Sequence, residues 1–166
     1  VAVGPDLVKP NREELAEVVG RELTSIAEVL EAAHELHARG VGHVLVSLGG
    51  DGAVLVGGQG ADDGDPRAAG TPGAPDLVGS STVADPRSTV GAGDAFLAGY
   101  LSAIHSSDAT APGDAGRSSA LLTALAWGAA AVRLPGSVIP SPSDIDLSAA
   151  RILPSPDLQS PLSPAS

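Results

Sequence analysis

The sequence predicts a three-layer α/β fold with a largely parallel central sheet. Short strand-like runs alternate with helical patterns along the chain, and the apolar residues are almost all aliphatic. Of the 166 residues, 43% are hydrophobic but only 2% are aromatic, so Val, Leu, Ile and Ala must form the core. Such side chains suit parallel strands that are covered on both faces. The length supports one hydrophobic core and is too short for two well-separated domains.

In the N-terminal part of the chain, strand-like runs flank two helical patterns. The helices begin at residues that commonly cap helix starts, Asn11 and Ser25, and end at the glycines Gly20 and Gly40. We therefore expect strands at 6–9, 44–48 and 53–56, and helices at 11–20 and 25–39. Because helical residues separate the first two strands, a right-handed crossover predicts that these strands share one sheet and run parallel.

The rest of the chain alternates between apolar helical stretches and segments rich in small or polar residues. Residues 57–79 are mostly Gly, Ala, Asp and Pro, which predicts a mobile surface loop. Residues 154–166 are rich in Ser and Pro and are predicted to form a disordered tail, which leaves 1–153 as one folded portion. Further expected elements are a strand at 80–84, a helix that starts at the Gly-rich segment 91–94 and extends to 104, and a loop at 106–116. Two more helices are expected at 118–133 and 144–153.

Charge and composition exclude several classes of partner. Nine basic and twenty acidic residues give a net charge of −11, which repels nucleic acids and anionic membranes. No apolar run approaches the roughly 20 residues that a membrane helix needs. Cysteine is absent, so thiolate metal sites and cysteine nucleophiles are excluded. We expect a soluble, cytoplasmic protein whose partners are small molecules.

The strongest candidate for chemistry is Gly91-Ala92-Gly93-Asp94, at the start of an apolar helix. Small residues let backbone N–H groups approach an anion closely, and a helix start carries partial positive charge. Asp94 beside such a phosphate cradle could accept a proton from an attacking hydroxyl. These four residues alone also fit a simpler interpretation, in which Asp94 only complements the helix dipole.

Two upstream segments are weaker candidates when taken alone. Asn11 and Glu14 have the spacing of a capping box as well as of oxygen groups near a hydrated cation, and both roles are compatible. The segment Ser47-Leu48-Gly49-Gly50-Asp51-Gly52 either contacts a ligand or forms an ordinary Gly-rich hairpin turn.

Taken together and in this order, the segments 9–14, 47–52 and 88–100 resemble the ribokinase-like (phosphofructokinase-B) family of carbohydrate kinases. Residues 127–140 resemble the family's segment near the adenine, so the resemblance covers most of 5–150. It implies a ribokinase-like three-layer sandwich and makes 1–153 the nucleotide-binding portion of such a kinase. This is about half of such an enzyme, because the family's N-terminal half has no counterpart here.

The resemblance also implies roles for individual residues. In the family, the aspartate that matches Asp94 is the catalytic base, and the preceding Gly91, Ala92 and Gly93 surround the transferring phosphoryl group. Asn11 and Glu14 would position Mg²⁺ largely through water. The residues expected to bind ATP are Lys9, Asn11, Ser47, Leu48, Gly49, Gly50, Asp51, Gly52 and Gly93.

Within the family, the segments are most similar to the branch that phosphorylates phosphosugars with ATP. Fructose 1-phosphate, converted to fructose 1,6-bisphosphate, is the favoured substrate. Tagatose 6-phosphate, fructose 6-phosphate and ribose remain alternatives, because the sugar site lies in the half of the family fold that has no counterpart here. A further hypothesis, beside these two kinds of kinase, is an inactive fragment that at most binds nucleotide. A homodimeric parent enzyme is also left open.

Overall fold

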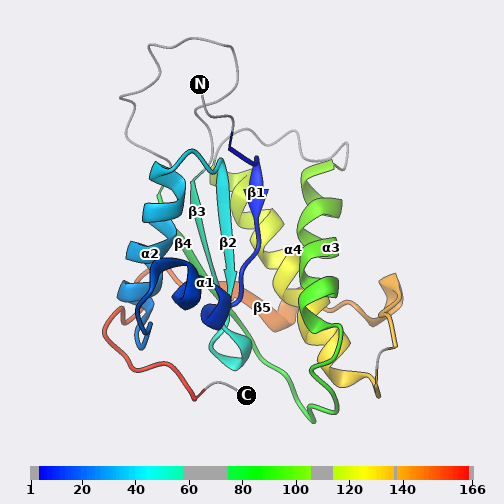
Figure 1. Cartoon of the computed structure of the whole chain (residues 1–166). Helices are drawn as coiled ribbons and strands as arrows, with labels where there is room; N and C mark the ends of the chain where they lie inside the picture. Colours follow the sequence, from blue (N-terminus) through cyan, green and yellow to red (C-terminus); the bar gives the residue numbers. More distant parts are fainter. Residues whose placement is uncertain (1–3, 58–74, 106–113, 137, 165–166) are drawn as a thin grey trace. The chain divides into compact units, whose positions relative to one another are not determined.

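The structure, a computed structural model, describes residues 4–57, 75–105, 114–136 and 138–164. Figure 1 shows the chain coloured along its sequence. The described residues belong to two compact units. The first unit consists of Val1–Gly49, Val54–Leu77 and Ser155–Ser166, and the second of Gly50–Ala53 and Val78–Pro154. Each unit has its own buried residues.

Three strands form the sheet of the first unit, in the order β1 (Leu7–Val8), β2 (His43–Ser47) and β3 (Ala53–Gly57). β1 and β2 are parallel, with Leu7 opposite His43 and Val8 opposite Val44, which confirms that these two strands share one sheet and run parallel. Residues 48–52 join β2 to β3. A parallel connection needs a dozen residues or more, so this pair is antiparallel.

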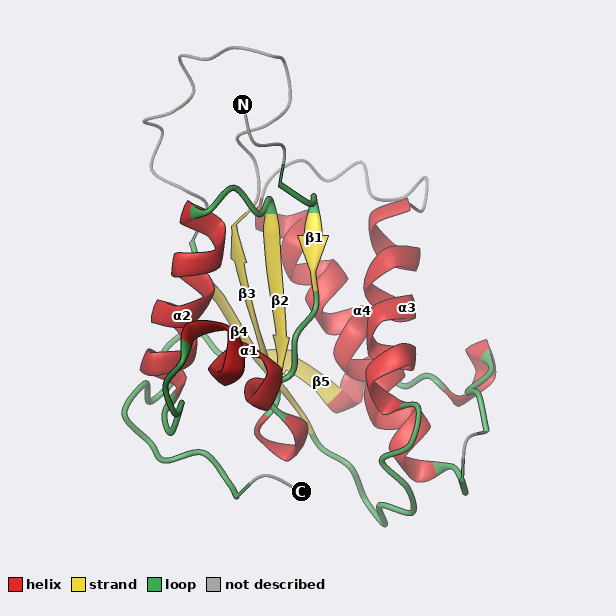
Figure 2. Cartoon of the chain, in the orientation of Figure 1, coloured by secondary structure: helices red, strands yellow, loops and turns green. Residues whose placement is uncertain are grey.

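Two helices pack beside these strands, α1 (Arg12–Val19) and α2 (Ile26–Ala38), as Figure 2 shows. Both predicted helices are confirmed, with Asn11 and Ser25 at their N-caps. Gly20 ends α1 in the left-handed conformation, with φ of 71°. The largest fully buried side chains in the first unit are Leu15, Val29, Val44, Leu45, Val46, Val54, Leu55 and Val56.

The segment that follows Pro154 does not match the disordered tail predicted from its composition. The Ala27 N–H donates to the Leu158 carbonyl at 2.9 Å, and the Leu162 N–H donates to the Thr24 carbonyl at 2.8 Å. Ser25 also forms an antiparallel bridge with Pro161. The start of a helix has N–H groups that need acceptors, and carbonyls of a Pro-rich segment can supply them. The segment is therefore seated on the first unit.

The second unit contains β4 (Leu77–Ser81), β5 (Ala150–Ile152), α3 (Ala92–His105) and α4 (Asp114–Arg133). β4 and β5 are antiparallel, with Gly79 opposite Ile152. The 144–153 helix prediction was wrong. Short 3-10 turns at Pro142–Asp144 and Leu147–Ala149 precede β5 instead. Proline at the first position of such a turn and the pairing of β5 with β4 together override the weak helical pattern.

Other differences concern where elements begin. β4 starts at Leu77 rather than at residue 80, and α4 starts at Asp114 rather than at 118. Most of the loops predicted at 57–79 and 106–116 lies outside the described residues.

Helices α3 and α4 pack closely where Gly99 contacts Trp127. A Cβ atom at Gly99 would lie 2.8 Å from Trp127 Cγ and 2.9 Å from the backbone oxygen of Thr123. A second glycine, Gly128, contacts Phe96 less tightly, since a Cβ there would lie 3.4 Å from Phe96 Cβ. The absence of a side chain at Gly99 therefore sets how closely these helices approach.

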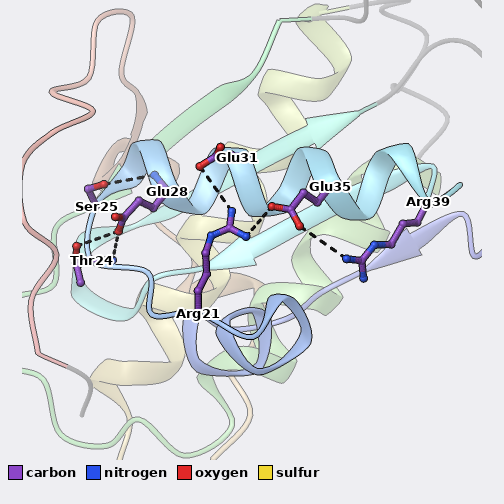
Figure 3. A network of polar contacts seen from close by, with 7 residues as sticks. All are labelled: Arg21, Thr24, Ser25, Glu28, Glu31, Glu35 and Arg39. Carbon is purple, nitrogen blue, oxygen red and sulfur yellow. Dashed lines mark hydrogen bonds and ion pairs between the residues drawn. The ribbon is translucent and has the colours of Figure 1, made fainter.

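A network of polar contacts runs along α2, from Thr24 before the helix to Arg39 at its C-terminal end (Figure 3). Arg21 Nη1 lies 2.6 Å from Glu35 Oε1, and Arg39 Nη2 lies 3.7 Å from Glu35 Oε2. These side chains are at least one-third exposed, so their ion pairs contribute little to stability. Glu28 differs from them, because its Oε2 accepts hydrogen bonds from Thr24 N at 2.6 Å and Thr24 Oγ1 at 2.9 Å. These bonds lower the pKa of the Glu28 carboxyl.

We expect Gly99→Ala to destabilise the chain. Alanine gains about 1 kcal/mol of helix propensity, but overpacking against fixed backbone atoms costs roughly 1–3 kcal/mol. The measurement is the free energy of unfolding in denaturant. Gly128→Ala is the matched control, since its Cβ has room and its stability should stay equal or rise. Equal stability of Gly99→Ala and Gly128→Ala would contradict this account of the helix contact.

We expect Glu28→Gln to lose stability at neutral pH and to approach the wild type in acid. The pKa of Glu28 is lowered by folding, so its stabilisation is present at neutral pH and is lost as pH falls through the folded pKa. Unfolding free energies of both proteins from pH 7 to pH 3 measure the effect. Glu31→Gln is the control, because Glu31 makes only an exposed ion pair with Arg21 at 3.6 Å. A constant difference across the pH range would refute the assignment.

Candidate active site

In the first unit, Asn11 and Ser47 lie side by side at the carboxyl ends of β1 and β2. They form a parallel bridge, and the Ser47 N–H donates to the Pro10 carbonyl at 3.2 Å. Pro10 favours an extended residue before it, which allows the chain to leave β1 and turn into α1 at Asn11. The carboxyl edge of a parallel pair is where open α/β sheets bind ligands. Two of the predicted motifs therefore meet at such an edge.

Asn11 and Glu14 form a complete capping box at the start of α1. The Glu14 N–H donates to Asn11 Oδ1 at 2.8 Å, and the Asn11 N–H donates to Glu14 Oε2 at 2.8 Å. The capping interpretation of this motif is therefore confirmed. These bonds use one carboxylate oxygen of Glu14, and its side chain is exposed. The second oxygen, Oε1, can still accept a bond from a water that is bound to a cation.

This arrangement fits a magnesium ion that is held through water. Mg²⁺ keeps several waters and is usually bound by one or two carboxylates together with substrate phosphates. Within 4–57, 75–105, 114–136 and 138–164, no group of three or more His, Cys, Asp or Glu residues could hold a metal directly. With Glu14 Oε1 uncommitted, Asn11 and Glu14 could orient the waters of such an ion.

The turn after β2 is a short 3-10 helix, Gly49–Asp51, rather than a two-residue hairpin turn. Gly49 and Gly52 have positive φ values of 58° and 101°. A Cβ at Gly52 would collide with the backbone oxygen of Gly79, so only glycine fits there. Gly49 and Gly50 are exposed, with no atom near their missing side chains. Leu48, by contrast, is buried and can offer a ligand only its backbone.

In the second unit, Gly91-Ala92-Gly93-Asp94 forms the first turn of α3. Gly91 has a φ of 78° and nothing lies near the position of its missing Cβ. The Ala92 N–H donates back to the Thr89 carbonyl at 3.2 Å, and the Ala95 N–H donates to the Gly91 carbonyl at 2.9 Å. The N–H groups of Gly93 and Asp94 lie between these two donors, and the helix itself gives them no acceptor. Asp94 is exposed in the same turn. The geometry is that of an open anion site beside a carboxylate.

The approach to this turn is held by the end of α4. The N–H groups of Arg87 and Ser88 both donate to the Val132 carbonyl, at 2.8 and 3.2 Å. Ser88 Oγ in turn accepts a bond from the Val90 N–H at 3.2 Å. These bonds fix the direction in which the chain enters α3, and hence where its first N–H groups point.

Sequence reasoning missed a small hollow within the second unit. It is lined by Thr82, Arg133, Asp144 and Asp146 together with alanines of α4 and Ala149. Hydrogen bonds from Ser141 and Ser148 lower the pKa values of Asp144 and Asp146, and the Arg133 charge adds to this. The residues that line the hollow come from segments far apart in the sequence. Arg133, a basic residue at the end of an Ala-rich helix, was therefore the only sequence signal for it.

The predicted site residues are thus distributed over both units. Lys9, Asn11, Glu14, Ser47, Leu48 and Gly49 belong to the first unit, and Gly50, Asp51, Gly52, Gly91, Ala92, Gly93 and Asp94 to the second. The first unit brings Asn11, Glu14 and Ser47 together. None of the helices among the described residues is long and apolar enough to cross a membrane.

Comparisons with known proteins address the origin of these motifs. The model of the "pfkB family carbohydrate kinase" matches residues 1–144. The 1-phosphofructokinase of Haloferax volcanii is 40% identical over 129 residues, which is 76% of this chain and 36% of that protein. The 1-phosphofructokinase of Rhodobacter capsulatus is 44% identical over 129 residues, 78% of this chain and 34% of that protein.

Solved structures support the same relationship. Phosphofructokinase-2 from Escherichia coli, in complex with substrates and products, superposes with a TM-score of 0.61 at 29% identity, over 86% of this chain and 39% of that one. Other sugar kinases, including a ribokinase, share the fold, so the predicted ribokinase-like α/β class is confirmed. The chain spans little more than one-third of the curated relatives it matches. It belongs to the pfkB family of carbohydrate kinases.

Proposed function

We propose that this chain supplies the ATP-binding and proton-accepting part of a phosphosugar kinase. The proposed reaction transfers the γ-phosphoryl group of ATP to fructose 1-phosphate and gives fructose 1,6-bisphosphate and ADP, the activity of a 1-phosphofructokinase. The observation that carries the proposal is the first turn of α3, where N–H groups without helical acceptors stand next to the exposed Asp94. Relatives that carry the name 1-phosphofructokinase, at 40% and 44% identity, support the choice of sugar.

In the proposed mechanism, Asp94 accepts the proton of the sugar hydroxyl as its oxygen attacks the γ-phosphorus. The bond from the γ-phosphorus to the bridging oxygen breaks, and ADP leaves with that oxygen. The N–H groups of Gly93 and Asp94 donate to the phosphoryl oxygens and stabilise their charge. Asn11 and Glu14 would hold a hydrated magnesium ion through its waters, and such an ion would supply further neutralisation of phosphate charge.

The remaining nucleotide contacts are assigned by the same proposal. The exposed backbone of Gly49 and Gly50 and the Ser47 side chain would contact ATP, and Lys9 would neutralise a phosphate. Asp51, Leu48 and Gly52 shape this turn. A homodimeric assembly and a cytoplasmic location stay predictions that accompany the proposal.

We expect the protein that carries this chain to phosphorylate fructose 1-phosphate with ATP. A coupled assay of ADP release should give a kcat/KM about tenfold or more above those for fructose 6-phosphate, tagatose 6-phosphate and ribose, since a misplaced phosphate leaves polar groups unpaired. A preference for one of these other sugars would overturn the substrate but not the kinase. Turnover of none of them, with no nucleotide binding, would overturn the proposed function.

We expect Asp94→Asn to abolish most turnover and to leave ATP affinity nearly unchanged. Asparagine keeps the shape of the side chain but cannot accept the proton, and loss of a positioned base costs roughly 10²–10⁴-fold in kcat. Steady-state kinetics and ATP titration measure the two effects. A pH profile of kcat separates loss of a base from loss of a phosphate contact, because only the first removes the rise in rate as the base ionises.

Asp85→Asn is the matched control for this substitution. Asp85 lies in the same approach to α3 and has a φ of 53°, a conformation that asparagine also tolerates. It should retain wild-type kinetics. If Asp94→Asn kept kcat within a few-fold of the wild type, Asp94 could not be the base.

A further inference from the structure

Residues 157–163, here named the C-terminal strap, cross the start of α2 and reach α1 in the first unit (red in Figure 1). A turn at Asp157 starts the strap, since Asp157 Oδ1 accepts from the Gln159 N–H at 3.1 Å and Oδ2 accepts from Ser160 Oγ at 2.8 Å. The strap then runs antiparallel past Ser25, through the bridge to Pro161. Its course is thus fixed by side-chain and backbone bonds.

The strap completes the cap of α2. Ser25 Oγ accepts from the Glu28 N–H at 3.3 Å, whereas the Ala27 N–H donates to the strap, at the Leu158 carbonyl. The Leu162 N–H donates back to the Thr24 carbonyl at 2.8 Å. Ser25 is buried beneath these contacts. The strap is therefore bonded at Leu158 and Leu162 to the start of α2, and the next residue, Ser163, contacts α1.

The contact of the strap with α1 is made through Arg12. Arg12 Nη1 donates to the Ser163 carbonyl at 2.7 Å, and Arg12 Nη2 lies 3.5 Å from Glu13 Oε1. The Arg12 side chain is only 16% exposed, whereas that of Glu13 is 52% exposed. Arg12 is the first residue of α1, directly after Asn11 and within the capping box that Glu14 closes. The strap thus holds the same turn that carries the proposed magnesium-orienting groups.

Helix α1 needs such an anchor. It has eight residues, and Leu15 is its buried one. Helices of this length are unstable by themselves, and their ends fray first. Asn11 and Glu14 are on the exposed first turn, so fraying would move both oxygen groups together. The Arg12 side chain is only partly exposed and its guanidinium donates to the anchored Ser163 carbonyl, which opposes this motion.

We propose that Arg12 is a positioning residue, which, through the C-terminal strap, holds Asn11 and Glu14 in the geometry that binds hydrated magnesium with nucleotide. The inference rests on the proposed function of the Asn11–Glu14 turn. It predicts that removing either Arg12 or the strap weakens magnesium-dependent binding. A purely structural strap would change thermal stability alone.

The experiment titrates ADP in the presence and absence of Mg²⁺ into the full chain and its variants. The variants are Arg12→Ala, Arg12→Lys, a chain that ends at Pro156, and Arg12→Ala in that shortened chain. Arg39→Ala is the matched control, because Arg39 pairs with Glu35 on the same unit and does not contact the strap. Amide hydrogen exchange at Glu14 is followed in parallel.

We expect Arg12→Ala to weaken ADP binding about tenfold when Mg²⁺ is present, as loss of an outer positioning contact does at metal sites. Binding without Mg²⁺ should change little. Shortening the chain should have a similar effect, and the combined variant should be no worse than either change, because both break one connection. Arg12→Lys should recover part of the affinity, Arg39→Ala should match the wild type, and Glu14 exchange should quicken in Arg12→Ala.

Two results would overturn the inference separately from the proposed function. If the wild type binds ADP with Mg²⁺ and Arg12→Ala does so equally well, the proposed function stands and the positioning role is wrong. If the wild type binds no ADP, the proposed function of this chain fails. Unchanged amide exchange at Glu14 in Arg12→Ala would show separately that Arg12 does not hold the first turn of α1. Should the shortened chain fail to fold, Arg12→Ala and Arg12→Lys decide the question.

Discussion

Backbone N–H groups at the starts of helices need acceptors, and the ways in which this chain supplies them organise much of its structure. At α1 the acceptors are side chains, Asn11 and Glu14. At α2 one acceptor is the Ser25 side chain and another is a distant carbonyl, that of Leu158. At α3 the helix gives Gly93 and Asp94 none, and glycines keep the approach open. The first two solutions stabilise the fold, whereas the third suits an anionic ligand.

The parts of the fold that could be predicted from the sequence are those set by neighbouring residues. Asn11, Ser25 and Gly20 mark helix ends through contacts that lie within a few positions, and these elements are confirmed. The pairing of Gly79 with Ile152 and the bond from Arg12 to Ser163 join positions far apart in the chain. Local composition contains no trace of such contacts. A Ser- and Pro-rich segment therefore resembled a disordered tail although its carbonyls have specific donors.

The same limit applies to the candidate site. The sequence predicted that the first two strands run parallel, and parallel strands end at a common edge, which is where Asn11 and Ser47 form their bridge. It could not decide between capping and cation binding at Asn11 and Glu14, because the same oxygen atoms serve both. Glycine spacing alone was equally ambiguous. No atom lies near the missing Cβ of Gly91, whereas a Cβ at Gly52 would collide with a backbone oxygen. Gly99 allows Trp127 to approach, so glycine meets a different constraint at each of these three positions.

The bond between Arg12 and Ser163 spans 151 positions, which has a consequence for synthesis on the ribosome. Translation adds about 5–20 residues per second, so Arg12 leaves the ribosome roughly 8–30 seconds before the carbonyl that it will bind. During this interval the nascent chain can form α1 and α2, while the Ala27 N–H and the Arg12 guanidinium remain bonded to water. Helices α1 and α2 thus reach their final state only when the C-terminal strap, which is made much later, arrives.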